Sequence, residues 1–385
     1  MVSSLGWTLV VLVVVCWILA AWFGWLEFAY VTVALLLLLV ISAVFLVGRL
    51  NLDVRLDVDP LRVSVGDSAA AQVVLVNRAK APTFALSAEV PVGLSTARYT
   101  VPPLRPGSEH SEMAIIPTKR RGVIDVGPVT TQRGDPFRIF RREVHWSERY
   151  EVFVHPRTVM IESLGSGLLR DLEGQTTNDV SMSDLAFHTL RPYVAGDDRR
   201  YIHWRSSAKA SATSGQDQFL VRQFLDTRRS HIGIIVDVDA QSYESEEDFE
   251  LAISAGASIA VRALTDQMDL TITCGEHAAV QPMPHTALDT FSRAGFEGAW
   301  SLAKAANRVN QLASDVSSVI LCTGTRATLP QFLRAKAHLA PEVTVLALCA
   351  RGGAPVALRE TSGISVLTIG ALADMQRVVA AGAAA

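Results

Sequence analysis

Two long apolar segments near the N-terminus dominate the hydrophobic pattern of this 385-residue chain. Trp7–Phe23 spans 17 residues and Ala29–Gly48 spans 20, and Glu27 between them is the only charged residue before Arg49. The hydrocarbon core of a bilayer, about 30 Å thick, needs roughly 20 apolar residues in a helix. The pattern therefore predicts two transmembrane helices, at about residues 7–23 and 29–48, that form a tight hairpin in the lipid bilayer.

The charges around these segments predict their orientation. No Lys or Arg precedes Trp7, whereas Arg49, Arg55 and Arg62 follow the second segment. Cytoplasmic flanks are enriched in Lys and Arg, so we expect a two-span protein of the plasma membrane with both termini and the soluble domains in the cytoplasm. A cleaved signal peptide and a hairpin buried inside a soluble protein are the alternatives.

Beyond the hairpin, hydrophobic and polar residues alternate with a period of two as far as about Pro156. Val54, Leu56 and Val58 alternate with charged residues, and turns rich in Gly and Pro separate similar short runs. Several short strands at such spacing are typical of a β-sandwich. Further strands are predicted at Val63–Val65, Val73–Val76, Phe84–Val90, Met113–Ile116, Val123–Val126 and Val152–Val154.

From Ser230 onward the pattern changes to longer apolar runs that alternate with helical periodicity. His231–Val236 is continuously apolar, as in a parallel strand buried on both faces. After the acidic residues Glu244–Asp248, apolar residues recur at spacings of three and four, which predicts a helix. This alternation predicts a doubly wound α/β sheet. Further strands are predicted at Leu270–Cys274, Ser318–Cys322, Val343–Cys349 and Ile364–Ile369, and helices at Trp300–Leu312, Leu329–Leu339 and Ala371–Ala381.

These patterns predict a multidomain chain, and composition narrows its class. The predicted parts are 1–50 (two transmembrane helices), 51–156 (β-sandwich domain), 157–229 (linking segment) and 230–385 (α/β domain). With 19% charged residues and a net charge of −3, the protein is not expected to be a general nucleic-acid binder, whose surface is strongly basic. Its four cysteines are widely spaced, which argues against a disulfide framework or a zinc site and fits a reducing compartment.

The linking segment is basic although the protein is acidic. From Arg191 to Arg229 it holds eight Lys or Arg against four Asp, a local balance of +4. If Tyr201–Arg205 is extended, alternate residues share a face, so that Ile202 and Trp204 are expected to be buried together.

A long motif runs through this segment. It comprises Arg191-Pro192-Tyr193 and then Gly196-Asp197-Asp198-Arg199-Arg200-Tyr201-Ile202-His203-Trp204-Arg205-Ser206-Ser207-Ala208-Lys209, supported upstream by Lys119–Val123 and Gly134–Phe137. The motif resembles the signature of the domain-of-unknown-function 58 family, and the resemblance covers essentially the whole chain. It implies a membrane-tethered protein with a von Willebrand factor type A-like domain. Members of that family are commonly encoded beside MoxR-type AAA+ ATPases and membrane-bound transglutaminase-like proteins.

Three interpretations of the basic motif stay open. Its arginines could lock the junction between domains by pairing with Asp197, Asp198 or backbone carbonyls. They could instead form a docking surface for a protein partner, because Arg and Trp are favoured anchors of interfaces. Contact with phosphate or nucleic acid is the third interpretation, but no Gly-rich phosphate loop accompanies the arginines. The residues assigned a partner-binding or structural role are Arg191, Tyr193, Gly196, Asp197, Asp198, Arg199, Arg200, His203, Trp204 and Arg205.

The α/β domain offers one candidate metal site. Ligands of open α/β sheets bind outside the carboxyl ends of the strands, where Asp237 and Asp239 follow the first strand. The family resemblance implies Asp-x-Ser-x-Ser at this place, which holds Mg²⁺ through oxygen ligands. This chain has Ala240 and Gln241 after Asp239 and lacks an Asp between Thr323 and Gly324. We therefore expect no bound cofactor, with Mg²⁺ held by Asp237 and Asp239 as the alternative.

No catalytic constellation is recognisable in the sequence. GxSxG, HExxH and GxxxxGK[ST] do not occur, and His203 has no nucleophile motif nearby. The sequence therefore predicts a non-enzymatic, membrane-anchored scaffold or adaptor whose cytoplasmic domains bind a protein partner, a MoxR-type ATPase being the one that the resemblance implies. The rival hypotheses are a Mg²⁺-dependent binding module and a cell-envelope enzyme whose soluble part faces outward.

Overall fold

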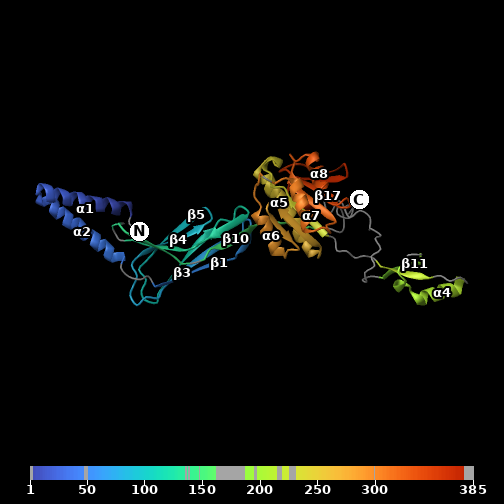
Figure 1. The fold of residues 1–385 in the computed structure, drawn as a ribbon, viewed down its shortest axis with the longest axis horizontal. Coiled ribbons are helices and arrows are strands. Elements are labelled where there is room, and N and C mark those ends of the chain that lie inside the picture. Colours follow the sequence, from blue (N-terminus) through green and yellow to red (C-terminus); the bar gives the residue numbers. More distant parts are fainter. Residues whose placement is uncertain are drawn as a thin grey trace. The chain divides into compact units, whose positions relative to one another are not determined.

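The computed structural model in Figure 1 describes most of the chain. The described residues are 3–46, 51–134, 137, 139–146, 148–161, 187–194, 197–214, 219–224, 231–298 and 300–376. The chain is divided into two compact units, Met1–Pro156 and Arg157–Ala385. The first contains a helical hairpin and a β-rich part, and the second mixes helices and strands.

The N-terminal hairpin consists of α1 (Ser4–Phe23) and α2 (Leu26–Leu46), both long and apolar enough to cross a membrane. Each helix begins before the predicted start, because hydropathy marks the apolar run whereas local hydrogen bonds mark the helix end. The Ser3 side chain accepts a hydrogen bond from Gly6 N (3.0 Å) and caps α1. Gly24, with φ 68°, ends it in the left-handed region that glycine adopts at little cost.

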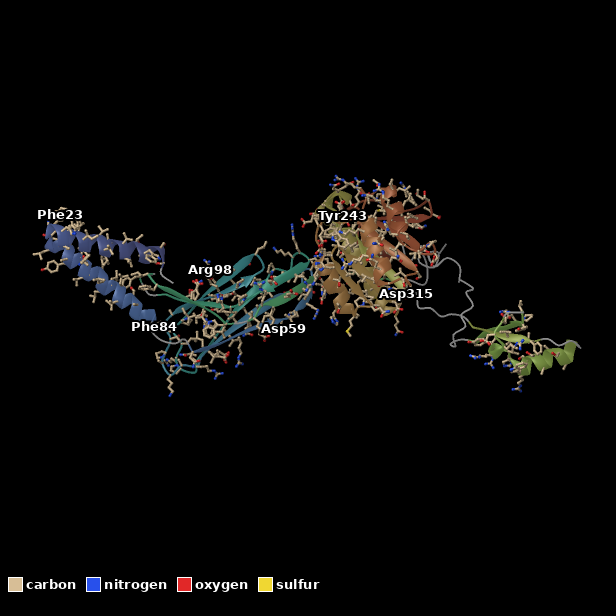
Figure 2. All side chains as sticks on the ribbon, in the orientation of Figure 1. Phe23, Asp59, Phe84, Arg98, Tyr243 and Asp315 are labelled. Atoms are coloured by element: carbon tan, nitrogen blue, oxygen red, sulfur yellow. The ribbon has the colours of Figure 1, made fainter. Side chains whose placement is uncertain are left out.

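Small residues lie between the two helices and large ones face outward. Gly6 and Cys16 of α1 and Thr32 and Ser42 of α2 are buried. Only 11% of each span is buried, and the side chains project from both helices, as Figure 2 shows around Phe23 at the turn. Close packing through small residues with an apolar exterior is typical of helices surrounded by lipid.

The β-rich part that follows is built from two sheets around one core. Its strands are β1 (Leu52–Asp59), β2 (Arg62–Ser64), β3 (Ala69–Asn77), β4 (Leu86–Val92), β5 (Ser95–Val101), β6 (Glu109–Ile116), β7 (Gly122–Val126), β8 (Thr130–Gly134), β9 (Arg141–His145) and β10 (Tyr150–His155). One sheet has the order β1-β3-β6, and the other has the order β2-β10-β7-β4-β8-β9 with β5 on β4. Val73 and Leu75 of the first sheet share a hydrophobic cluster with Val90 and Val152 of the second. All the strands predicted here are confirmed, and β5, β8 and β9 are additional.

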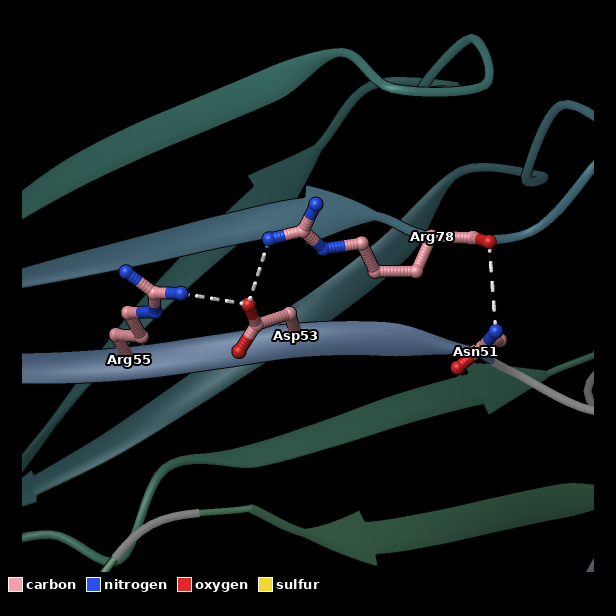
Figure 3. A network of polar contacts seen from close by, with 4 residues as sticks. All are labelled: Asn51, Asp53, Arg55 and Arg78. Atoms are coloured by element: carbon pink, nitrogen blue, oxygen red, sulfur yellow. Dashed lines mark hydrogen bonds and ion pairs between the residues drawn. The ribbon is translucent and has the colours of Figure 1, made fainter.

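A polar cluster closes one edge of the smaller sheet (Figure 3). Asp53 at the start of β1 accepts hydrogen bonds from Arg55 (2.9 Å) and from Arg78 after β3 (3.2 Å). These guanidinium groups, Arg55 foremost, lower the pKa of the Asp53 carboxyl. Asn51 Nδ2 donates to the Arg78 carbonyl at 3.3 Å and closes the network. Two arginines against one aspartate leave this cluster positive, close behind the second helix in the sequence.

The second unit contains a seven-stranded sheet, with the order β15-β14-β13-β16-β17-β19-β18. Its strands are β13 (His231–Val236), β14 (Asp269–Cys274), β15 (His277–Val280), β16 (Ser318–Gly324), β17 (Thr344–Ala350), β18 (Ala357–Thr361) and β19 (Ile364–Ile369). The helices are η2 (Ala240–Ser242, 3-10), α5 (Glu246–Thr265), α6 (Pro284–Arg293), α7 (Leu302–Leu312) and α8 (Leu329–Lys336). The five central strands are parallel, and the two edge strands are antiparallel.

Helices cover both faces of this sheet. We call the sheet together with these helices the sheet domain. Ile234 of β13 lies in a cluster with residues of α5 and α6, whereas its neighbour Ile235 lies in a cluster with residues of α7 and α8. Burial on both faces explains the unbroken apolar run of β13. The predicted α/β alternation is therefore confirmed; α6 and both edge strands are additional. Of the helix predicted at Ala371–Ala381, the part beyond Gln376 lies outside the described residues.

The basic segment folds as a small α/β element rather than as an extended strand. Its parts are β11 (Phe187–Pro192), the 3-10 helix η1 (Arg199–Tyr201), α4 (Trp204–Ser214) and β12 (Leu220–Phe224), with β11 antiparallel to β12. The extended conformation that we considered for Tyr201–Arg205 does not occur, because η1 ends at Tyr201 and α4 begins at Trp204. Ile202 is buried as predicted, but Trp204 is 62% exposed because the helix turns it away from the Ile202 face.

Candidate functional site

The motif of the basic segment is held together by backbone hydrogen bonds. Tyr193 N donates to Phe219 O (2.8 Å), and His203 N donates to Leu220 O (2.8 Å). Ser207 Oγ accepts from Leu220 N (2.8 Å) and donates to His203 O (3.0 Å), which joins α4 to β12. These bonds fix the end of β11, the start of β12 and the first turn of α4 as one frame.

The side chains of the two motif aspartates accept hydrogen bonds from other residues of the same frame. Asp197 receives both guanidinium nitrogens of Arg191, each at 2.7 Å, and the backbone N–H of Val194 at 2.9 Å. The Arg191 hydrogen bonds, with the Val194 N–H second, lower the pKa of Asp197 to about 2. Asp198 accepts from Arg200 N (2.9 Å) and caps η1.

Among the described residues, the remaining arginines of the motif have no such carboxylate partner. Asp197 pairs with Arg191 rather than with Arg199, Arg200 or Arg205, which were considered as its partners in the first of the three interpretations. These three side chains are exposed, and within the described parts of the chain they form no ion pair. Among the described residues, therefore, no carboxylate compensates these three exposed positive charges. Gly196, like Asp135 and Pro136 of the supporting motif, lies outside the described residues.

An aromatic strip lies in the same frame. Phe219 makes edge-to-face contacts with Trp204 (ring centroids 5.9 Å apart) and with Tyr193 (6.5 Å). Trp204 is 62% exposed, Phe219 43% and Val194 62%. We call Tyr193, Val194, Trp204 and Phe219, together with Arg199, Arg200 and Arg205, the aromatic–arginine surface. Neither Val194 nor Phe219 is part of the motif; Phe219 comes close to it only because β12 pairs with β11.

His203 has a structural role in this frame. Its Nδ1 accepts a hydrogen bond from Ser206 N (3.1 Å) at the start of α4. This contact satisfies one of the free N–H groups that every helix N-terminus exposes. The ring nitrogen that a general base would use as an acceptor is therefore occupied by the backbone.

We predict that Asp197→Asn loosens the turn of the motif, because the neutral amide cannot replace the ion pair with Arg191. Since the folded pKa of Asp197, about 2, lies below its ordinary value of 3.8, the ion pair contributes fully above pH 3.8 and is lost as pH falls toward 2. Hydrogen exchange at Val194 N–H should be faster in Asp197→Asn near neutral pH. The difference should shrink as pH falls through about 2, where Asp197 becomes protonated. Asp198→Asn, which leaves the Arg191 pair intact, is the control, and equal exchange in all three proteins would contradict the prediction.

At the carboxyl end of β13, Asp237 is buried among protein donors. Its carboxylate accepts from Thr323 Oγ1 (2.7 Å) and Asp239 N (3.1 Å), and the Ser242 hydroxyl also hydrogen bonds to it. Burial raises the pKa of this carboxyl despite these bonds. Asp239 accepts from Gln241 N (2.9 Å) and caps η2. Ser242 was missed as a site residue, because it lies outside the Asp-x-Ser-x-Ser spacing.

Asp237 and Asp239 are the candidate ligands for Mg²⁺, and protein donors compete for their oxygens. Both aspartates already accept hydrogen bonds from protein donors, and the described residues contain no group of three or more His, Cys, Asp or Glu that could hold a metal. We therefore predict that adding Mg²⁺ or Mn²⁺ leaves the Tm of the full chain in detergent unchanged. A Tm that rises with metal in the wild type but not in Asp237→Ala would establish the metal-dependent module instead.

The cysteines of the sheet domain are core residues. Cys274, Cys322 and Cys349 are buried near the carboxyl ends of their strands and form no disulfide. Burial raises the pKa of the Cys322 thiol and of the Cys349 thiol to about 12. Thiols that stay protonated at neutral pH are poor nucleophiles, so Cys322 and Cys349 are suited to the core rather than to nucleophilic chemistry.

Comparisons with known proteins leave the family of the chain open. No protein-family model matches it, and no curated protein matches it. A CARDB domain from Pyrococcus furiosus is 17% identical and covers 27% of this chain and 92% of its own, with a TM-score of 0.21. Cwp6 from Clostridium difficile is 11% identical and covers 78% and 38%, with a TM-score of 0.19. An alkylpurine DNA glycosylase from Pseudomonas fluorescens is 16% identical and covers 28% and 33%, with a TM-score of 0.19. Likenesses this low carry no argument.

Proposed function

We propose that this protein is a non-enzymatic, membrane-anchored scaffold or adaptor that binds a protein partner through its aromatic–arginine surface. The observation that carries the proposal is that Trp204 and Phe219 are exposed in the same small element as three exposed arginines, for which the described residues supply no carboxylate partner. Aromatic side chains and arginine supply most of the strongly contributing residues in protein interfaces. A frame closed by backbone hydrogen bonds presents these side chains in fixed positions, which lowers the ordering cost of binding.

The membrane anchor in this proposal is the α1–α2 hairpin. Ser3 N donates to Ile139 O (2.9 Å), so α1 begins beside the β-rich part that also follows α2. Two spans therefore leave both ends on one side of the bilayer. The basic flank with Arg49, Arg55 and Arg62 supports the cytoplasmic side of the plasma membrane for the soluble domains.

The partner in this proposal is a MoxR-type AAA+ ATPase. The support is the motif's resemblance to the domain-of-unknown-function 58 family, together with a parallel sheet covered by helices on both faces, as a von Willebrand factor type A-like domain would have. A fold alone does not specify function, so the proposal depends on the exposed surface rather than on the sheet.

Co-purification from native membranes tests this function. We predict that the full chain retains an AAA+ ATPase and that Arg199→Glu with Arg200→Glu lowers its retention at least about tenfold, because like charges across an interface cost several kcal/mol. Arg334→Glu with Arg359→Glu, two exposed arginines of the sheet domain, makes the same charge change elsewhere and should retain the partner. Retention unaffected by the first pair of substitutions would show that the surface is not the docking site.

A further inference from the structure

We propose that the aromatic–arginine surface recognises an acidic segment of the protein partner, and that this segment places an aromatic or aliphatic side chain against the exposed rings. The inference rests on the proposed function and adds the chemistry of the bound segment. Two features of the surface carry it, its uncompensated charge and its preformed apolar strip.

The charge of the surface selects an acidic segment. The described part of the basic segment holds six Lys or Arg against two Asp. Asp197 is engaged by Arg191 at 2.7 Å, and Asp198 caps η1. Neither carboxylate is free to neutralise Arg199, Arg200 or Arg205. Guanidinium groups form bidentate hydrogen bonds with carboxylates, so an acidic segment of the partner can pair with these arginines. A basic segment would be repelled.

The aromatic strip selects an apolar side chain within that segment. Phe219 contacts Trp204 on one side and Tyr193 on the other, so three rings form a continuous row. Val194, 62% exposed, follows Tyr193 directly at the end of β11. Covering these exposed rings with an apolar side chain of the partner removes apolar surface from water and so favours binding.

The structure favours a protein segment over a lipid surface. Helices that lie on membranes carry several large apolar residues along one face. The described helix α4 reads WRSSAKASATS, and Trp204 is its only large apolar residue. Among the described basic residues of the segment Lys209 is the single lysine, whereas arginine is the residue suited to geometrically specific carboxylate pairing.

Photo-crosslinking in native membranes tests the proposal with the full chain. A benzophenone amino acid in place of Val194 reports what lies on the surface, and mass spectrometry identifies the attached segment. The expected adduct is a protein segment with net negative charge and an aromatic or aliphatic residue at the attachment point. The same probe in place of Leu94, an exposed residue between β4 and β5, is the control and should not yield this adduct.

Charge reversal in the same experiment tests the acidic character directly. Arg199→Glu with Arg200→Glu should lower the adduct yield at least about tenfold, whereas Arg334→Glu with Arg359→Glu should not. A synthetic peptide of the captured segment should compete for the probe, and its version with Gln and Asn for Glu and Asp should compete at least about tenfold less well.

The outcomes separate this inference from the proposed function. An adduct with a neutral or basic protein segment would overturn the inference and leave the scaffold function standing. An adduct with lipid alone, or none at Val194 while the ATPase is still retained, would overturn the surface as the binding place. If the chain without charge substitutions gives no adduct at Val194 and retains no ATPase, the proposed function is refuted as well.

Discussion

Replacing Gly324 with alanine is expected to destabilise the sheet domain by roughly 3 kcal/mol, because a Cβ there would collide with backbone atoms. The added carbon would lie 2.1 Å from the Ser242 carbonyl oxygen and 2.8 Å from the Tyr243 Cα. Backbone atoms cannot rotate aside as the end of a flexible side chain can. Scanning calorimetry of the detergent-solubilised chain should show the Tm of this domain falling by about 6–12 °C.

The control for this substitution is Gly298→Ala in the same domain. Nothing lies within 4 Å of a Cβ at Gly298, so its Tm should stay close to that of the wild type. An unchanged Tm for Gly324→Ala would mean that the loop after β13 moves away from the end of β16 at little cost. In that case the contact would not hold Thr323 beside Asp237, and the internal pairing of Asp237 would have to be reconsidered.

Removing residues 1–46 is expected to transfer the protein from the membrane to the soluble fraction. The two helices carry apolar exteriors, and insertion of about 20 apolar residues each is effectively irreversible, whereas the rest of the described chain buries its own cores. The wild type should resist alkaline carbonate extraction of membranes, and the shortened chain should be recovered in the supernatant.

A milder variant controls for damage caused by the deletion. Leu37→Arg places a charge in the middle of α2, which costs about 2.5–3.5 kcal/mol on insertion, whereas Leu37→Ala should leave membrane association intact. A mature N-terminus that begins after α1 would instead establish a cleaved signal peptide. Complete carbonate extraction of the wild type would refute the membrane hairpin.

Most elements of the two large folded parts are readable from the sequence because burial there follows strict periods. β13 is buried on both faces and reads as an unbroken apolar run, and β3 alternates as a strand with one buried face does. Three of the strands that were missed, β9, β15 and β18, lie at the ends of their sheets. β9 reads RREVH and β18 reads ALRET, so little apolar pattern marks them. Their positions follow from hydrogen bonds to a neighbouring strand, β8 or β19.

The candidate site was readable as a motif but not as a surface. Its arginines and aspartates are adjacent in sequence, yet their pairing depends on a turn that brings Arg191 to Asp197 across six positions. The expectation that Trp204 is buried failed because a period of two was assumed where a helix begins. Phe219 and Trp204 are 15 residues apart in the chain. Phe219 becomes part of the surface only because β12 pairs with β11.

The sequence by itself was sufficient for the two long apolar helices, the order of β-rich and α/β parts, and the basic motif, because hydrophobicity and charge act locally along the chain. Tertiary structure was needed to show which aspartates accept hydrogen bonds from protein donors, which arginines are exposed, and why a side chain at Gly324 would collide with backbone atoms. These properties depend on atoms distant in sequence that meet at distances of a few ångströms. Ser242, for example, reaches both Asp237 and Gly324 only after β13 and β16 have paired side by side.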